Sequence, residues 1–289
     1  MIIFFANGRL GNQIFQYVFL KTIQKNNEKI IVCGFDDLFN VFELNDKTII
    51  NLPKKNKWIR RFICKPLKPV YNKLSYFKLI SSTKVNHEKI LEKYNRESME
   101  FCITNGLIKN INFIKLGYFQ SERFFNKETT KNLKIKERFL LKAKEFLKQY
   151  ENNYKVFVHI RRGDYKNFFV YGKETILPMS YFHNQIKWFL ENRKSVVFVF
   201  LSDEPDFIKD EFDYLDNKII SKNSYEVDFA IMTLCNGAIL SPSSFGWWGS
   251  YLMKNRDTVF APKYWVGWKS KINHYNKEPL ANFMKKIEV

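Results

Sequence analysis

Residues 154–164, YKVFVHIRRGD, decide the fold of the second half of the chain. This stretch is a continuous apolar run that ends at two arginines, a glycine and an aspartate. Three more apolar runs follow, at 196–201, 237–240 and 258–261, and helical patterns lie between them, at 179–191, 226–235 and 245–253. Continuous apolar strands between helices are typical of a parallel sheet covered on both faces. We therefore predict an α/β fold with ligands at the carboxyl ends of its strands.

The paired arginines after the first run suit a diphosphate, because guanidinium groups match phosphate oxygens and stay charged. Strand alternation points Arg161 and Arg162 in opposite directions. We predict Arg161 at the phosphate and Arg162 as a partner for Asp164. The alternative is a structural ion pair between Arg161 and Asp164.

Two other strand ends carry polar groups. Ser241, Ser243 and Ser244 precede a predicted helix, where hydroxyl and free N–H groups favour a second phosphate contact. Ser244 could equally be only a helix cap. Asp203 follows the run at 196–201 and is placed to accept hydrogen bonds from a ribose or guanine, with His159 nearby. A core histidine is an equally good interpretation of His159. We assign the adjacent Trp247 and Trp248 to the core.

The first half opens as a strand, 2–5, a glycine-containing turn, 7–11, a helix and a second strand, 30–32. This pattern indicates a βαβ unit. A helical pattern returns at 131–150, and the polar break at 151–153 marks the predicted domain boundary. We predict domains at 1–150 and 151–289.

The formal charge of +19 is unevenly distributed, at +16 in residues 1–150 and +3 in 151–289. Between residues 51 and 87 there are ten Lys and Arg and no acid, and Pro66 and Pro69 are expected to interrupt any single long helix there. A Lys-rich solvated surface explains the excess. A sharper hypothesis is that residues 54–80 lie on an anionic membrane leaflet. Binding of RNA is disfavoured, because no RNA-binding signature appears.

Several common chemistries have no motif in this sequence. There is no phosphate-binding loop of the GxxxxGK[ST] type, no GxGxxG, no Asp-x-Asp triplet and no Cys/His cluster of metal-ligand spacing. Kinase and nicotinamide chemistry are therefore disfavoured, and we expect transfer without a metal or cofactor. With no membrane-span or signal-peptide pattern, the expected location is the cytoplasm.

Six strings in combination resemble glycosyltransferase family 11, the α-1,2-fucosyltransferases. They are GRLGNQIFQY (8–17), GYFQSE (117–122), HIRRGDY (159–165), SDE (202–204), SSFGWWG (243–249) and APKYW (261–265). The chain departs from the usual bacterial pattern at Arg9, Glu204, Pro242 and Gly246. These departures leave the donor-site residues in place.

The resemblance implies a GT-B-like fold, in which two Rossmann-like domains face each other across a cleft, with 1–150 on the acceptor side and 151–289 binding GDP-β-L-fucose. It implies that Arg161 contacts the diphosphate, that His159 and Asp203 recognise guanine, that Ser243 and Ser244 touch phosphate, and that Asn12 lies by the glycosidic oxygen. Arg162, Phe245, Gly11 and Gln13 lie in the same strings and are added as substrate contacts.

The implied reaction is an inverting, metal-independent transfer of L-fucose to the 2-hydroxyl of a galactose-terminated glycan, free or lipid-linked, in surface-glycan synthesis. Asp164 is the acid nearest the motif and is a candidate base, although a strongly dissociative reaction needs no strong base. The alternative is a fucosyltransferase of other linkage or acceptor, α-1,6 or protein O-linked.

Overall fold

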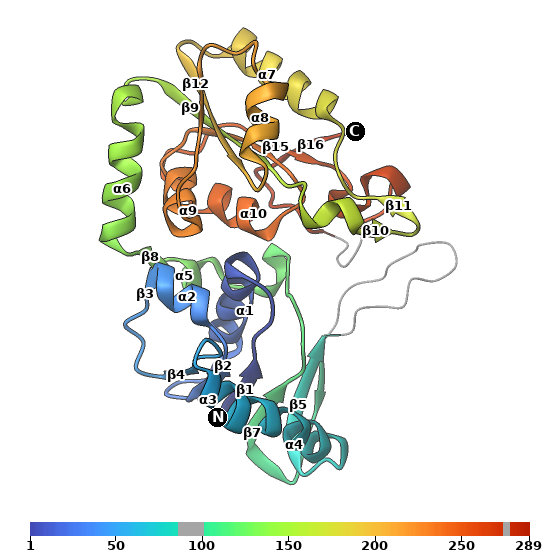
Figure 1. Ribbon diagram of the computed structural model, residues 1–289. Coiled ribbons are helices and arrows are strands. Elements are labelled where there is room, and N and C mark those ends of the chain that lie inside the picture. The colour runs from blue at the N-terminus through green and yellow to red at the C-terminus, as the bar shows by residue number, and fades with distance from the viewer. Residues whose placement is uncertain (86–100, 274–277) are drawn as a thin grey trace. The chain divides into compact units, whose positions relative to one another are not determined.

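The computed structural model describes residues 1–85, 101–273 and 278–289 (Figure 1). The chain divides into two compact units, 1–134 and 135–289. This division lies earlier than the predicted one at 150/151, because helix α6 (Glu137–Leu147) packs on helix α9 (Tyr225–Thr233) of the second unit. Both units are α/β with largely parallel sheets, as predicted.

The first unit is built on a six-stranded sheet of order β4-β2-β1-β7-β5-β6, parallel except for the antiparallel pair β5–β6. Its strands are β1 (Ile2–Phe5), β2 (Ile30–Cys33), β4 (Ile49–Leu52), β5 (Ile80–Val85), β6 (Phe101–Thr104) and β7 (Ile108–Ile114). Its helices are α1 (Leu10–Ile23), α2 (Asp36–Val41), α3 (Lys57–Ile59), α4 (Lys65–Tyr76) and α5 (Lys127–Thr130). Two short strands, β3 (Phe42–Glu43) and β8 (Lys134–Ile135), pair with each other in a separate two-stranded sheet. The predicted βαβ opening is confirmed as β1-α1-β2.

The second unit has a six-stranded, fully parallel sheet of order β13-β12-β9-β14-β15-β16. Its strands are β9 (Tyr154–Ile160), β12 (Val196–Ser202), β13 (Lys218–Ile220), β14 (Gly237–Leu240), β15 (Val259–Pro262) and β16 (Lys285–Ile287). Its other helices are α7 (Met179–Asn192), α8 (Pro205–Glu211) and α10 (Ser244–Tyr251), and the short hairpin β10 (Phe169–Val170) and β11 (Lys173–Glu174) lies apart from the sheet. The strand order runs outward in both directions from β9, so its carboxyl end is the switch point where such sheets bind ligands.

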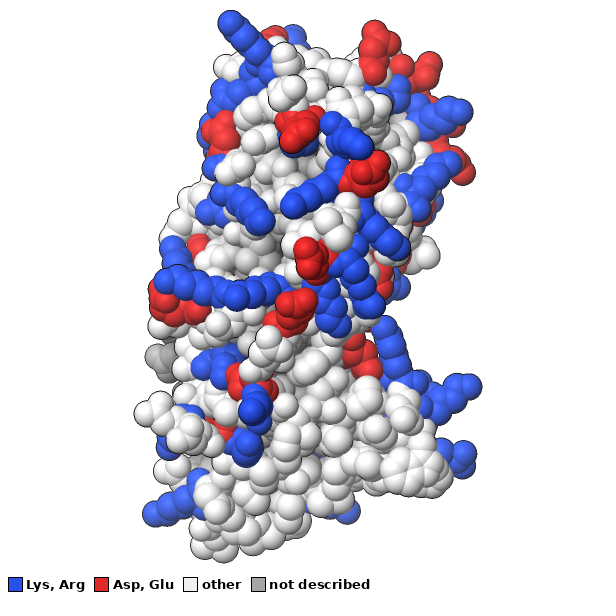
Figure 2. Space-filling view, turned by 90° about the vertical axis from the view of Figure 1, so that its left-hand side faces the viewer, with Lys and Arg blue, Asp and Glu red and all other residues white. Residues whose placement is uncertain are grey.

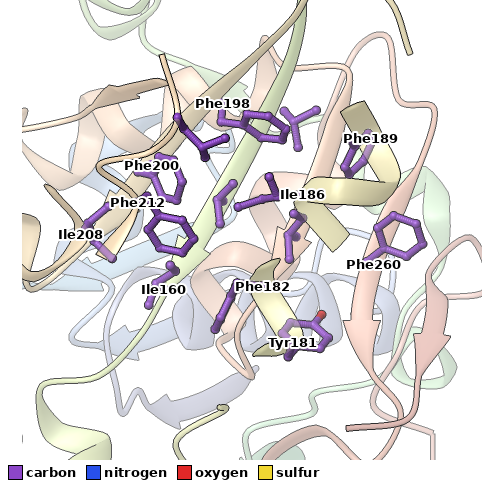
Figure 3. Packing of buried hydrophobic residues seen from close by; sticks show 14 of the residues in the cluster. Ile160, Tyr181, Phe182, Ile186, Phe189, Phe198, Phe200, Ile208, Phe212 and Phe260 are labelled. Atoms are coloured by element: carbon purple, nitrogen blue, oxygen red, sulfur yellow. The ribbon is translucent and has the colours of Figure 1, made fainter. Parts of the chain in front are cut away.

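Alternation along β9 separates the two faces of this sheet. Val156, Val158 and Ile160 join an aromatic core with α7 and α8 (Figure 3), to which Phe182, Phe189, Phe198, Phe200, Phe212 and Phe260 contribute. His159 faces the other way, because successive strand residues point to opposite faces, and its ring lies 6.0 Å from that of Phe245 in α10. Core packing on one face therefore fixes the direction of the polar side chains on the other.

Tryptophans 247 and 248 belong to the core, as predicted. They are 1% and 0% exposed, and the Trp247 ring stacks on Tyr251 while its Nε1 donates to the Pro279 carbonyl at 2.9 Å. Buried indoles with this packing are structural groups, because no face is left for a sugar.

The basic stretch forms no single long α-helix, as predicted, but the break lies at Arg60–Cys64 and not at the prolines. A helical path runs through α3, a π-helical turn at Arg60–Cys64, and α4, which contains both Pro66 and Pro69. Pro66 stands in the first turn of α4, where proline is best tolerated. Pro69 lies inside α4 and removes an interior hydrogen bond.

The two units differ in charge. Residues 1–134 contain 24 Lys and Arg against 11 Asp and Glu, whereas residues 135–289 contain 24 against 18. On the face shown in Figure 2, the basic side chains of the second unit (upper half) are interspersed with acidic ones. Among the described residues no helix combines the length and apolarity that a bilayer span requires.

Candidate functional site

Arg161 is the first residue after β9 and lies at the switch point. Its backbone N–H donates to Ser241 Oγ at 3.0 Å, which ties the end of β9 to the end of β14. Its Nε donates to Asp164 Oδ1 at 2.8 Å, and its Nη1 lies 3.2 Å from Asp203 Oδ2. Burial disfavours the charged guanidinium, but these two carboxylates raise its pKa. Within the described part of the chain Nη2 has no hydrogen bond, so this fixed cation keeps free donors for an anion.

The carboxylate of Asp203 holds the loop that follows β9. Oδ1 accepts the Arg162 N–H at 3.1 Å and Oδ2 accepts the Gly163 N–H at 3.0 Å. A Cβ added at Gly163 would lie only 2.6 Å from Oδ2, so the close approach requires glycine. Together with the ion pair to Arg161, these bonds occupy both carboxylate oxygens and leave less capacity for the predicted contact to a nucleoside.

The prediction that Arg162 pairs with Asp164 is wrong. The chain turns into a short 3-10 helix at Asp164–Asn167, which brings Asp164 back to Arg161 instead. Arg162 donates from Nε to Glu204 Oε2 at 3.0 Å, and its Cζ lies 3.7 Å from the centroid of the Phe207 ring. Arg162 is therefore tied to α8. The ion pair between Arg161 and Asp164, which the sequence left as the alternative, is present.

His159 is 6% exposed, and its imidazole makes no hydrogen bond within the described residues, so that Nδ1 is a buried atom without a partner. Burial, assisted by the charge of Arg161 and opposed by Asp203, lowers the pKa of this imidazole to about 4. A Cβ on Gly246 would approach its ring to 3.2 Å. A neutral imidazole with an unused nitrogen is unusual in a core, since buried polar groups are generally bonded.

The start of α10 carries the predicted serines. Ser243 is the N-cap, and its Oγ accepts the Phe245 N–H at 3.3 Å. Ser241 is buried, and its hydroxyl accepts the Arg161 N–H. Of the three serines, Ser244 is therefore the one whose hydroxyl we still expect to contact a phosphate. The N-terminal N–H groups of a helix favour negative charge through the helix dipole.

Sequence reasoning missed Asp228 in α9. Ser221, the first residue after β13, donates its hydroxyl to Asp228 Oδ1, and burial raises the pKa of this carboxyl to about 6. A serine directly after a strand and an acid early in the next helix were visible signals, at the same carboxyl edge as the other site residues. β13 is only three residues long, however, and has no apolar run by which it could be predicted from the sequence.

The two buried groups predict opposite dependences of stability on pH. Below pH 6.5 the unfolded chain protonates His159 while the folded one does so only near pH 4, so the free energy of unfolding falls as pH drops through this window. The total is about 3 kcal/mol from the size of the shift. Asp228 has a raised pKa, so its folded form takes up the proton first and stability rises as pH falls below about 6.

Urea unfolding between pH 7 and 5 separates these contributions. We expect His159→Gln to reduce the loss of stability on acidification, and Asp228→Asn to increase it, relative to the unmodified chain. Equal slopes in all three proteins would show that neither group is held in the state described.

In the first unit, the loop between β1 and α1 is built around Asn12. Gly8 has φ +81°, and a Cβ there would lie 2.3 Å from Asn12 Nδ2. Asn12 Oδ1 accepts a hydrogen bond from Gln120 Nε2 at 2.7 Å, which joins the 8–17 and 117–122 strings. The side-chain amide of Asn12 is therefore tied to the second string, and Gly8 leaves room for it.

Gln13 supports this loop from within. Its Oε1 accepts the N–H groups of Asp37 and Leu38 at 3.0 and 2.9 Å, and its Nε2 donates to the Gly8 carbonyl at 3.1 Å. Gln13 and Gly11 are both buried. Gln13 therefore shapes the loop and the start of α2, and substrate contact by Gln13 and Gly11 stays a prediction.

Comparison with known proteins gives a family match over nearly the whole chain. The model of Glycosyl transferase family 11 matches residues 1–278. An alpha-1,2-colitosyltransferase of Escherichia coli is 28% identical over 94% of both chains, and the O-antigen biosynthesis glycosyltransferase WbnK of the same species is 25% identical over 92% of this chain and 95% of that one. Bovine galactoside alpha-(1,2)-fucosyltransferase 1 is 28% identical over 36% of this chain and 30% of its own.

The fold also resembles a solved structure. The crystal structure of NodZ alpha-1,6-fucosyltransferase with GDP aligns with a TM-score of 0.50 over 87% of this chain and 92% of that chain, at 10% identity. At this identity the likeness concerns the fold alone. It agrees with the predicted GT-B-like architecture of two α/β units.

Proposed function

Because the chain belongs to glycosyl transferase family 11, we propose that it transfers L-fucose from GDP-β-L-fucose to the 2-hydroxyl of a β-galactoside, with inversion at the anomeric carbon. The family model, which matches residues 1–278, supports the reaction class. The names of the bacterial and bovine relatives support the α-1,2 linkage, and that of the bovine enzyme supports fucose and a galactoside. We place the protein in the cytoplasm, in synthesis of a surface glycan, as the name of WbnK suggests.

The observation that carries the proposal is the set of groups at the carboxyl edge of the second sheet. Arg161 is a fixed cation with free donors. Ser244 begins helix α10, which follows β14, the strand next to β9. His159 offers an unpartnered nitrogen. A diphosphate needs the first two kinds of group, and a base or ribose supplies hydrogen-bonding partners for the third.

Negative charge develops on the β-phosphate of GDP as the bond to fucose breaks. Arg161 and the N-terminal N–H groups of α10 stabilise that charge where it appears, and they supply this stabilisation without a metal. Asp203 and Asp164 fix the guanidinium for this task. Asp164 is bonded to Arg161 and serves to position it. A dissociative reaction needs no strong base, so Asp164 is not required to remove the proton of the acceptor.

A second donor is favoured by one specific observation, the similarity to the colitosyltransferase along 94% of the chain. Colitose differs from fucose in lacking the 3-hydroxyl. The same diphosphate site would serve GDP-colitose. The α-1,6 and protein O-linked alternatives have support only from a structural likeness at 10% identity, which concerns the fold.

The test is release of GDP in the presence of EDTA from GDP-fucose and from GDP-colitose, with lactose and N-acetyllactosamine as acceptors. We expect acceptor-dependent release from GDP-fucose, with a product linked through the 2-position of galactose. Faster turnover of GDP-colitose would assign the second donor, and release that requires Mg²⁺ would contradict the charge assignment. A product of another linkage would overturn the acceptor proposal while keeping the donor.

A further inference from the structure

The helical path of the first unit, Lys57–Tyr76, exposes aromatic side chains on its outer side. Trp58 is 62% exposed and Phe62 57%, and their ring centroids are 5.6 Å apart. At the other end of the path Tyr76 and Phe77 are 79% and 66% exposed and make an edge-to-face contact. Scattered apolar residues on a surface are normal, whereas grouped aromatics indicate an interaction site.

A neighbouring turn adds aliphatic side chains to the same end. The N–H groups of Leu107 and Ile108 donate to the carbonyls of Lys78 and Leu79 at 3.0 and 2.9 Å, so the turn before β7 lies beside the end of α4. Leu107 is 80% exposed. We call this surface, made of the outer side of residues 57–79 together with 107–108, the basic-aromatic face.

The cations of the basic-aromatic face have no acidic partners within residues 1–85, 101–273 and 278–289. Seven basic side chains are exposed along it: Lys57, Arg60, Arg61, Lys65, Lys68, Lys73 and Lys78. None of the seven forms an ion pair with a residue in the described part of the chain, whereas Lys55, just before them, pairs with Asp37. The face therefore carries seven exposed cations among exposed apolar side chains.

The inner side of the same helix is fixed to the sheet. Leu67, Tyr71 and Leu74 pack against a core that includes Ile80 and Phe113, and the rings of Tyr71 and Phe113 stack at 5.9 Å. Figure 1 shows α4 beside β5 and β7. The outer aromatics are thus held on a rigid element and are not exposed because the segment is detached.

We propose that the basic-aromatic face docks on an anionic bilayer surface, with Trp58, Phe62 and Phe77 in the headgroup region. Charge complementarity selects this occupant, because anionic lipids attract clustered Lys and Arg while aromatic rings favour the interface. The aliphatic Leu107 and Val70 fit hydrocarbon and cannot stack on bases, which disfavours a nucleic acid. This inference is independent of the donor and the acceptor proposed above.

The experiment is cosedimentation of the full chain with vesicles of phosphatidylcholine alone or mixed with phosphatidylglycerol, without any sugar nucleotide. We expect binding only to the mixed vesicles and a roughly 30-fold weaker partition for the double variant Arg60→Ala/Arg61→Ala. The matched control is Lys142→Ala/Lys144→Ala on α6, which removes the same charge from an exposed helix of the second unit and should leave partition unchanged. Trp58→Ser/Phe62→Ser should weaken the binding that remains at high salt.

Each other outcome counts against the proposal. Equal partition to both kinds of vesicle, or an equal loss in the two double variants, would remove the specific role of this face. Tight binding of polyuridylate that needs Arg60 and Arg61, with no vesicle binding, would assign the face to RNA. Melting temperatures of all variants show that the comparison is made between folded proteins.

Discussion

Replacing Arg161 with alanine should lower kcat by about 10²- to 10³-fold, the usual cost of removing one group that stabilises developing charge. The guanidinium is the fixed cation after β9, and its Nε and Nη1 are already engaged by Asp164 and Asp203. Its remaining donors are those that we propose for the β-phosphate. The measurement is steady-state GDP release from GDP-fucose with a saturating galactoside.

Two matched variants sharpen this prediction. Arg161→Lys keeps a charge but cannot hold both carboxylates in the same plane, so it should recover only part of the rate. Arg162→Ala removes the contacts to Glu204 and Phe207 on α8 and should have a much smaller effect on kcat. A larger loss for Arg162→Ala than for Arg161→Ala would reverse the assignment of the two arginines.

The sequence was sufficient for the framework of the second unit because its strands are continuous apolar runs. β9, β12 and β14 were predicted to within a residue, and with them the carboxyl edge where Arg161 contacts Asp203. β13 has only three residues, Lys218–Ile220, so Ser221 and Asp228 stayed hidden. Periodicity identifies long buried strands and misses short edge strands.

Side-chain partners were harder to predict than positions. Alternation correctly separated Arg161 from Arg162, but the 3-10 turn that returns Asp164 to Arg161 has no periodic signal. Long-range hydrogen bonds were equally inaccessible. Gln13 accepts N–H groups in the first turn of α2, a contact that no motif indicated.

Two cysteines of the first unit are a further case in which the sequence does not predict which side chains lie together. Cys33 and Cys64 are far apart in sequence, yet both are buried in the same core cluster of the first unit. Burial, together with the neighbouring thiol of Cys64, raises the pKa of Cys33. Only the packing of the π-helical turn near the end of β2 brings them together, and spacing rules cannot anticipate it.

Gly163→Ala should lower kcat/KM by about 10²-fold while leaving the fold intact, because it displaces the carboxylate that holds the arginine loop; charged hydrogen bonds are worth about 1.5–3 kcal/mol each. The new Cβ would lie 2.6 Å from Asp203 Oδ2, so the bonds to the Arg162 and Gly163 N–H groups would have to lengthen. Asp203→Ala should cost at least as much, since it leaves both N–H groups without that acceptor. Asp203→Asn keeps one oxygen and should recover part of the activity.

A double-mutant cycle tests whether Gly163 and Asp203 act through the same contact. If they do, Gly163→Ala should cost little in the Asp203→Ala background, because the carboxylate with which its Cβ collides has gone. Asp203 is a positioning residue that acts through Arg161. The loss of activity should therefore fall on kcat, with a smaller change in the dissociation constant of GDP. Additive losses in the cycle, or losses that merely follow a lowered melting temperature, would mean that the loop is a structural feature with no part in orienting Arg161.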